Sequence, residues 1–362
     1  MTKSKFSHFS HIEKIKRKKN DAKSREEFYR LDKNEMISDF ESSFLKKIKK
    51  RINSFHINTY PEINDVYKKL AKSLKVSSDN IILTSGSDLG IKNCFELFVR
   101  KKNEVITINP TYGMVSVYAK LFQAKQIKIN CEKNLRINTS KILKKINHKT
   151  SLVVIANPNS PTGSVISQQN IIQILSKAKE NNCYVLIDEC YYHYYGQTSL
   201  NLISRFSNLI ISRSFSKIGL AGCRIGFLIS NKALRRKLYK FRPFYEITSF
   251  SVLLLNEFLE NKNITKKYIQ QTKRGKLYLS KYFIKKNIFF FSTSTNFILI
   301  ILKNRKVTNK LFNQLLKNRI LVTIEKNIPH YKYVIRFTVG PAYIMRKVIK
   351  VIDKIISNKP SF

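Results

Sequence analysis

The sequence predicts an α/β fold, in which a large domain with a mainly parallel sheet flanked by helices is followed by a smaller α+β C-terminal domain. The chain has 362 residues, 43% of them hydrophobic, which is enough to bury a substantial core. Apolar runs at 152–156, 184–188 and 208–212 indicate buried strands, and a helix is expected at 168–181. Strands that alternate with helices favour a parallel sheet with right-handed crossovers.

The other elements follow the same periodicities. Val66, Leu70 and Leu74 share one face of an expected helix, and residues 81–84 and 104–108 are expected strands. From about residue 232 the pattern changes to longer helical stretches. In that part we expect a basic helix at 264–286, strands at 296–302, near 320 and at 334–340, and a helix near 307–317.

These patterns divide the chain into four segments. Residues 1–28 are basic and aperiodic, so we expect a poorly ordered extension. Residues 29–60 are expected to form an N-terminal arm, residues 61–240 the large domain and residues 241–362 the small C-terminal domain.

The composition is strongly basic, with 68 Lys and Arg against 23 Asp and Glu and a net charge of +45. Such a charge suggests a polyanionic partner. The lysines are spread through nearly every segment and no nucleic-acid-binding module accompanies them. We therefore expect nonspecific binding to nucleic acid and no specific recognition of it.

Two further absences in the sequence bear on location and metal binding. The chain has no uncharged apolar run of membrane-spanning length, and its N-terminus lacks the apolar core of a signal peptide, so we expect a cytoplasmic protein. The five cysteines are scattered without paired metal spacing. They are expected to be buried, reduced thiols, and no metal site is predicted.

A lysine loop marks the candidate site. Lys217 lies among hydroxyl and glycine residues between two expected strands, a position at the edge of the sheet where binding groups are often presented. In a chain so rich in lysine, an ordinary solvated lysine is the alternative. Upstream, an apolar strand ends in Asp188, and Tyr191 follows after a short turn. A pyridoxal phosphate type of cofactor needs these parts: an amine for its aldehyde, a carboxylate for its pyridine nitrogen and a phenol for its ring oxygen.

The order of three motifs resembles a known family. Residues 214–227 read Ser-Phe-Ser-Lys-x-Gly-Leu-Ala-Gly-x-Arg-x-Gly-Phe, residues 188–191 read Asp-Glu-x-Tyr, and residues 157–163 read Asn-Pro-Asn-Ser-Pro-Thr-Gly. From about Leu31 to the C-terminus the chain resembles the class I/II aminotransferases of the aspartate aminotransferase fold, which is fold type I of the pyridoxal-phosphate-dependent transferases. Within them it is most similar to the histidinol-phosphate aminotransferases. The resemblance implies pyridoxal 5'-phosphate as the cofactor and Lys217, Asp188 and Tyr191 as catalytic residues.

A turn into a helix at residues 85–90 suits the cofactor phosphate. Free backbone N–H groups and the helix dipole favour an anion there, and glycine permits a close approach. The resemblance implies that Gly86, Ser87 and Asp88 hold the phosphate. We expect Asp88 to use its backbone N–H while its side chain caps the helix. Hydroxyl groups and a charged guanidinium from the lysine loop, Ser214, Ser216 and Arg224, are expected to join them.

The ring of the cofactor is expected to meet an aromatic residue and a polar loop. The resemblance places Tyr112, in Pro-Thr-Tyr-Gly, against the pyridine face, where stacking contributes roughly a kcal/mol; a core tyrosine is the alternative. In many relatives an asparagine precedes Pro-Thr-Gly and bonds the ring oxygen, whereas this chain has Ser160. Ser160 through water, Asn157 or Asn159 can take that place, and the sequence leaves the choice open.

Substrate contacts rest on resemblance alone. Asn34 lies in a segment that folds over the substrate in the family, and an ordinary loop residue is the alternative. Met36-Ile37 stands where the family has Asn-Pro, which leaves the contact of this arm with the substrate open. Arg336, in Arg-x-Thr-x-Gly, takes the place of the arginine that binds the anionic group of the substrate.

A tyrosine of the arm indicates a dimer. The resemblance implies that Tyr60, in Tyr-Pro, reaches the cofactor phosphate of the other subunit of a homodimer. A tyrosine at a helix entry is the alternative.

The expected reaction moves an amino group between glutamate, with 2-oxoglutarate formed, and an anionic amino compound such as histidinol phosphate. Its partners are therefore a small-molecule amino donor and a keto acceptor. A decarboxylase of a phosphorylated amino acid, similar to threonine-phosphate decarboxylase, shares the motifs and is one alternative. A basic nucleic-acid-binding protein with a decayed site is the other.

Overall fold

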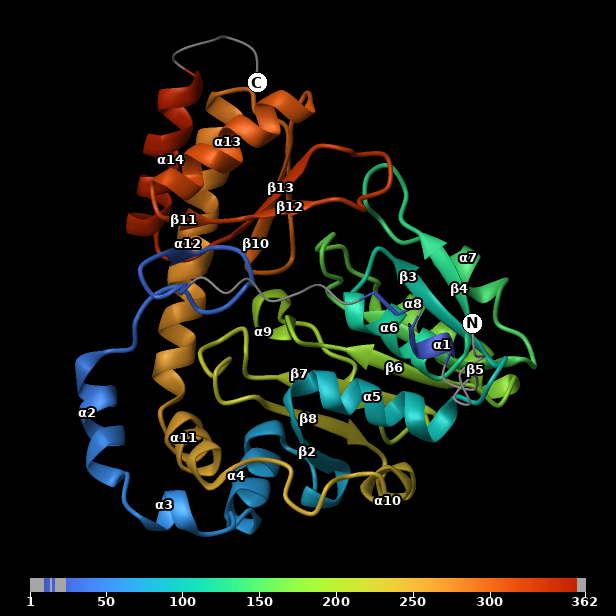
Figure 1. Ribbon diagram of the computed structural model, residues 1–362. Helices are drawn as coiled ribbons and strands as arrows, with labels where there is room; N and C mark the ends of the chain where they lie inside the picture. Colours follow the sequence, from blue (N-terminus) through green and yellow to red (C-terminus); the bar gives the residue numbers. More distant parts are fainter. Residues whose placement is uncertain (1–9, 14, 17–23, 357–362) are drawn as a thin grey trace, which may run out of the picture.

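At the centre of the structure, a computed structural model that describes residues 10–13, 15–16 and 24–356, is a seven-stranded sheet (Figure 1). Strand β8 runs antiparallel to both of its neighbours, and every other neighbouring pair is parallel, so the expected mainly parallel sheet is confirmed. The strands in spatial order are β2 (Ile81–Ser85), β8 (Ile225–Ser230), β7 (Leu209–Ser214), β6 (Tyr184–Asp188), β5 (Thr150–Ala156), β3 (Glu104–Asn109) and β4 (Lys125–Asn130).

Helices cover both faces of this sheet, because successive side chains of each strand point to opposite sides. Val153 and Ile155 pack into one cluster, and Leu152 and Val154 into another. The helices α5 (Gly86–Phe98), α6 (Gly113–Leu121) and α10 (Lys232–Tyr239) contribute buried side chains to the second cluster. The first is completed by α4 (Asn64–Leu74), α7 (Thr139–Leu143), α8 (Gln168–Glu180) and α11 (Ser249–Glu260).

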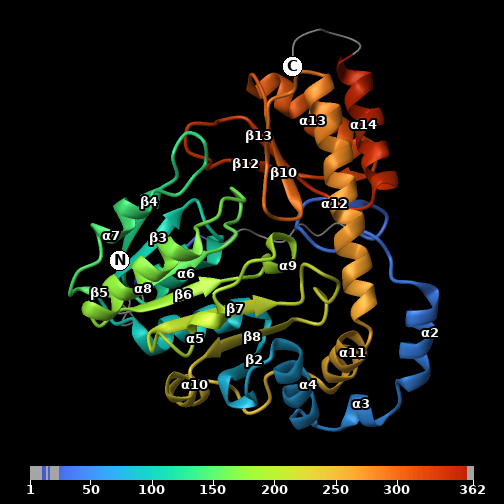
Figure 2. The ribbon, with the colours of Figure 1, turned by 180° about the vertical axis from the view of Figure 1, so that it is seen from behind.

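The C-terminal part has its own sheet and core, so the predicted α+β C-terminal part is confirmed. Its four antiparallel strands lie in the order β12-β13-β10-β9. The long helix α12 (Lys262–Lys285) runs from α11 to this sheet, as Figure 2 shows from behind. The remaining elements are β9 (Phe290–Ser292), β10 (Phe297–Ile301), α13 (Arg305–Lys317), β11 (Ile320–Leu321), β12 (Thr323–Glu325), β13 (Val334–Thr338) and α14 (Ala342–Ile356).

The N-terminal segment joins both parts. Its elements are α1 (Ser10–Glu13), β1 (Tyr29–Arg30), α2 (Ser42–Arg51) and α3 (Phe55–Asn58). Strand β1 pairs in parallel with β11, and Leu31 and Ile37 are buried in the core of the C-terminal part. Phe44 and Ile48 of α2 pack into the main core.

Two predictions about the ends of segments stay predictions. The poor order expected for residues 1–28 falls largely on residues outside those that the structure describes. The division at residue 240 is untested; Ile247, Leu255 and Tyr268 beyond it pack in the cluster of the central sheet.

The helices and cysteines add two facts. Within residues 10–13, 15–16 and 24–356, no helix is both long and apolar enough to cross a membrane. The five cysteines are free; four are buried and Cys223 is partly buried.

Candidate active site

The carboxyl ends of the parallel strands meet at one edge of the central sheet, and a cavity of about 590 Å³ lies there. Strand β6 ends at Asp188 and β7 ends at Ser214, and both residues line the cavity. Lys217 and Tyr191, from the loops after these strands, line it too. The structure therefore brings together residues that are far apart in the sequence, as expected at the carboxyl edge of an open α/β sheet.

Lys217 lies on the loop between β7 and β8, with its amine beside the N-terminal segment. The amine Nζ donates to the carbonyl oxygen of Lys33 over 3.3 Å. It lies 5.7 Å from the centre of the Tyr191 ring. The carbonyl oxygen of Lys217 accepts a hydrogen bond from the Tyr194 hydroxyl at 2.7 Å, which anchors the loop. The amine is thus held at the cavity by one weak bond that a ligand can replace.

Asp188 is nearly buried at the end of β6. Its carboxylate accepts a hydrogen bond from the backbone N–H of Cys190 at 3.2 Å. Burial raises the pKa of Asp188, while the bonds from Cys190 and the charge of Lys217 act in the opposite direction. A cation placed against this carboxylate, such as a protonated pyridine nitrogen, would favour its charged form.

Asn34 holds Tyr191 in position, and Arg336 in turn holds Asn34. The amide nitrogen of Asn34 donates to the Tyr191 hydroxyl at 2.8 Å, which leaves the proton of that hydroxyl free to be donated into the cavity. Arg336 donates to the side-chain oxygen of Asn34 and, through Nε, to Glu325 at 2.7 Å. Neither Asn34 nor Arg336 reaches the cavity wall, so their predicted contact with substrate stays a prediction.

The start of α5 and the guanidinium of Arg224 form a cradle for an anion. Gly86 has a φ of +72°, and a Cβ there would lie 2.7 Å from Nη2 of Arg224, so the guanidinium rests directly on this glycine. Ser214 donates to Ser216 through the two hydroxyls at 2.9 Å, and Ser87 lines the same cavity. Among residues 24–356 no ion-pair partner of Arg224 is found. Free helix N–H groups, hydroxyls and an unpaired guanidinium are the groups that hold a phosphate.

Asp88 differs from its expected role. Its carboxylate accepts hydrogen bonds from the hydroxyls of Tyr112 at 3.2 Å and Tyr118 at 2.9 Å, so it does not cap the helix. Tyr112, whose ring is 39% exposed, lines the cavity and is held there by this bond. Burial and then the Asp88 carboxylate raise the pKa of Tyr112, which keeps the phenol neutral.

The loop after β5 presents Ser160 to the cavity. The side-chain amide of Asn157 forms two hydrogen bonds with the backbone of Ile166, at 3.1 and 2.9 Å. Asn159 donates to the carbonyl oxygen of Pro110 at 2.9 Å and to the Thr162 hydroxyl at 2.8 Å. Both asparagines are buried in the loop and do not line the cavity. Their hydrogen bonds hold the loop in its shape. Of the three candidates left open, Ser160 has the position for contact with the ring.

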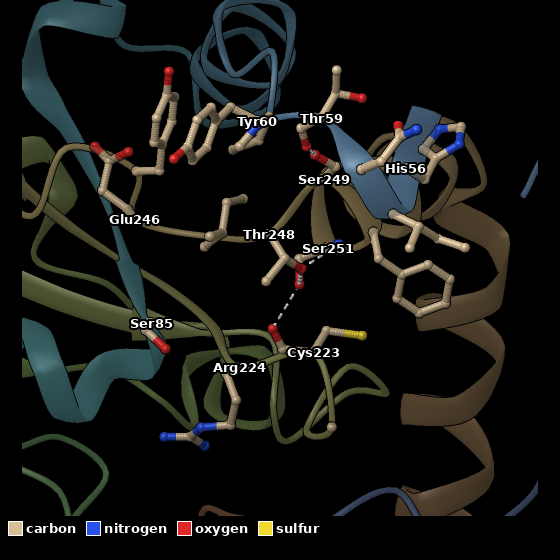
Figure 3. A pocket seen from close by; sticks show the side chains of 17 residues that line it. His56, Thr59, Tyr60, Ser85, Cys223, Arg224, Glu246, Thr248, Ser249 and Ser251 are labelled. Atoms are coloured by element: carbon tan, nitrogen blue, oxygen red, sulfur yellow. Dashed lines mark hydrogen bonds between the residues drawn. The ribbon is translucent and has the colours of Figure 1, made fainter. Parts of the chain in front are cut away.

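Tyr60 lies outside this cavity. It is 75% exposed and stacks on Tyr245, with the ring centres 4.5 Å apart. Both tyrosines line a neighbouring cavity of about 850 Å³, and Arg224 borders both cavities. Figure 3 shows Tyr60 and Arg224 on opposite sides of this second cavity.

Several residues of the cavity wall were not predicted from the sequence. Arg25, Arg30, Lys33 and Glu35 line the cavity from the N-terminal segment. Arg25 was assigned to the basic extension, because a charged side chain without helical or strand periodicity carries no sign of where it folds.

The chemical groups around the cavity fit a phosphorylated aldehyde cofactor. One end has the anion cradle at Gly86 and Arg224, and a lysine amine and a buried carboxylate lie further along the same wall. These are the partners that the phosphate, the aldehyde and the ring nitrogen of pyridoxal phosphate require.

Comparisons with known proteins agree with this arrangement. Residues 27–355 match the family described as aminotransferase class I and II. The histidinol-phosphate aminotransferase of Clostridium novyi (strain NT) is 31% identical over 327 residues, which cover 88% of this chain and 89% of that protein.

Solved structures show the same fold. Histidinol-phosphate aminotransferase from Sinorhizobium meliloti, in complex with pyridoxal-5'-phosphate, has a TM-score of 0.85 at 20% identity and covers 98% of this chain and 99% of its own. The enzyme of that name from Clostridium acetobutylicum has a TM-score of 0.81 at 24% identity, with 91% and 99% covered. The sequence match over most of the chain, joined to a cavity that fits the cofactor, leads to one conclusion: the chain belongs to the class I and II aminotransferases and is an enzyme that uses pyridoxal 5'-phosphate.

Proposed function

We propose that the enzyme transfers an amino group between glutamate and a phosphorylated amino compound of the histidinol phosphate type. The observation that carries this proposal is the 31% identity to a histidinol-phosphate aminotransferase over 88% of the chain. The cationic lining of the cavity, which includes Arg25, Arg30 and Lys33 beside Lys217, supports an anionic substrate. The cytoplasmic location stays a prediction from the sequence.

The roles of the side chains follow from their positions. When bound, pyridoxal phosphate supplies an aldehyde that combines with amines and a ring that withdraws electrons from the neighbouring carbon. The Lys217 amine would take a proton from the substrate carbon and would deliver it to the aldehyde-derived carbon of the bound cofactor. Asp188 would stabilise a proton on the ring nitrogen through a charged hydrogen bond. Tyr191 and Ser160 would hold the ring oxygen through hydrogen bonds, and Tyr112 would contact the ring.

The phosphate of the cofactor is assigned to the cradle. Ser87, Ser214 and Ser216 supply hydroxyls, and Arg224 supplies the charge. The N–H groups at the start of α5 add further donors. These groups would hold the phosphate in the cavity that Lys217 also lines.

A homodimer is the proposed assembly, with Tyr60 of one subunit serving the phosphate cradle of the other. Large apolar side chains cluster around Tyr60 and remain exposed in the single chain: Phe55, Ile57, Phe244, Tyr245 and Phe250. A contiguous apolar surface of this kind marks a protein interface. The second cavity, between Tyr60 and Arg224, gives a partner chain access to the cradle (Figure 3).

Spectroscopy of the purified enzyme tests the reaction. After loading with pyridoxal phosphate, glutamate should convert the wild type to its pyridoxamine form, and histidinol phosphate should do the same. Lys217→Ala should bind the cofactor without turnover. Carbon dioxide release is measured in parallel, because a decarboxylase would lose the carboxylate of its substrate. Sustained amino transfer by Lys217→Ala, or carbon dioxide release without amino transfer by the wild type, would show the assignment to be wrong.

Mixing two inactive variants tests the dimer. Lys217→Ala keeps Tyr60, and Tyr60→Ala keeps Lys217, so a mixed dimer contains one site with both residues. If Tyr60 acts across the interface, refolded mixtures should recover about a quarter of the normal sites. Mixtures that recover no amino-transfer activity beyond that of the two parents would place Tyr60 in its own subunit's site or outside the site.

A further inference from the structure

The N-terminal segment contributes a cationic wall to the active-site cavity, which amino transfer itself does not use. Arg25, Arg30 and Lys33 line the cavity together with Glu35. The cradle assigned to the cofactor phosphate lies at Arg224, just before β8, and at the start of α5. The cationic wall comes from a different element, β1 and its flanking residues.

Arg25 is held rigidly in this wall by two carboxylates. Its guanidinium lies 2.6 Å from Asp32 and 3.1 Å from Glu35. Its Nε atom is buried and has no hydrogen-bond partner within the described part of the chain. The two carboxylates therefore fix the orientation of the Arg25 guanidinium within the wall.

Arg30 and Lys33 leave charge facing the cavity. Arg30 approaches Glu35 only at 4.0 Å, and no ion pair of Lys33 is found among the residues described. The three cations of the wall face two carboxylates, which leaves an excess of one positive charge. The carbonyl oxygen of Lys33 accepts the hydrogen bond of the Lys217 amine at 3.3 Å. The cationic wall therefore lies beside the reacting amine.

We propose that Arg25, Arg30 and Lys33 form the subsite for the phosphate ester of the amino substrate, with Asp32 and Glu35 as positioning residues. This inference rests on the proposed function and names the residues that select a phosphorylated substrate. A phosphate monoester carries close to two negative charges near neutral pH and offers three acceptor oxygens. The excess positive charge of the wall and the planar donor groups of its arginines suit such a phosphate.

Steady-state kinetics of the cofactor-loaded enzyme test the subsite. Arg30→Gln and Lys33→Gln are compared with wild type, using histidinol phosphate and histidinol, which lacks the phosphate. Each substitution should lower kcat/KM for histidinol phosphate about ten- to a hundredfold, because it removes a charged hydrogen bond. Activity with histidinol should change less than about twofold. Lys101→Gln is the matched control, since Lys101 is an exposed lysine before β3, at the opposite edge of the sheet.

Equilibrium binding of inorganic phosphate gives a readout that needs no turnover. Phosphate should bind the loaded wild type in competition with the amino substrate, and Arg30→Gln should weaken that binding about tenfold. Equal losses with histidinol phosphate and histidinol, or unchanged phosphate affinity in Arg30→Gln, would overturn the inference while leaving aminotransferase activity intact. A wild type that ignores histidinol phosphate but binds phosphate through Arg30 would instead refute the proposed substrate and support the subsite.

Discussion

Removing Arg213 should cost the enzyme a large part of its stability, because this arginine neutralises a buried carboxylate beneath the active site. The guanidinium donates to Glu189 through Nε at 3.0 Å and through Nη2 at 2.8 Å, and the side chains of both residues are 2% exposed. It also lies 3.7 Å from the centre of the Tyr192 ring. Glu189 directly follows Asp188, and Arg213 directly precedes Ser214, so the pair ties together the strand ends that carry the site.

The expected magnitude follows from this burial. Arg213→Met leaves Glu189 buried without a counter-charge, and breaking such a pair costs about 3–5 kcal/mol. Glu189 keeps a bond of 2.6 Å from the N–H of Ser199, which does not replace the lost charge. Adding Glu189→Gln removes the charge and keeps an acceptor for Ser199, so the double variant should regain about 1–2 kcal/mol.

Urea unfolding of the cofactor-free protein measures these changes. Lys177→Met is the control, because its ion pair with Glu180 is exposed, at 45% and 63%, and its loss should cost less than about 0.5 kcal/mol. A cost below about 1 kcal/mol for Arg213→Met, or a double variant no more stable than the single one, would refute the reasoning.

Three other substitutions probe the cofactor site. Gly86→Ala should weaken cofactor binding at least about tenfold in titrations, because it adds a Cβ against Arg224 at a φ of +72°. The control is Gly196→Ala, where φ is +86° and the space around the glycine is open. This control should lower the melting temperature and leave the cofactor affinity unchanged. Tyr112→Leu should raise the dissociation constant of the cofactor about two- to tenfold through lost stacking, and an unchanged constant would argue against ring contact. Because burial raises the pKa of Asp188, the cofactor-free folded protein keeps a proton on this carboxyl that the unfolded chain has released. The contribution of Asp188 to stability therefore falls as the pH rises through its folded pKa. Asp188→Asn should therefore stabilise the cofactor-free protein at about pH 7.5, with a gain that shrinks as the pH falls; a gain that grows would contradict this sign.

The inner strands of the central sheet were predictable because they are buried on both faces, whereas the more exposed edge strand β4 was not predicted. A strand such as β5 is apolar at nearly every position, which distinguishes it from the amphipathic helices beside it. The alternation of strands and helices predicted a mainly parallel sheet, with Asp188 and Lys217 at the carboxyl ends of its strands. The order of the strands was not predicted. The fold and the outline of the site are thus consequences of local patterns.

The fine placement of polar side chains was not predictable, because it depends on partners distant in the chain. Asp88 occupies the first turn of α5, where a carboxylate usually caps the helix. The hydroxyls of two tyrosines, 24 and 30 residues further along the chain, donate hydrogen bonds to its carboxylate instead. Arg25 likewise meets Asp32 and Glu35 at separations of 7 and 10 residues, spacings that no regular element imposes.

The departure of Met36-Ile37 from the Asn-Pro of the family has a physical explanation in the arm. The backbone N–H of Ile37 donates to the Tyr268 hydroxyl at 3.2 Å, and a proline at this position would have no N–H to offer. The Ile37 side chain fills the space over Gly340, where an added Cβ would lie 2.4 Å from it. The bond and the packing fix the chain just after Asn34, which has a φ of 58° and reaches Tyr191. Tyr268 and Gly340 therefore hold this part of the arm through contacts with Ile37, the residue that stands in the place of the family's proline.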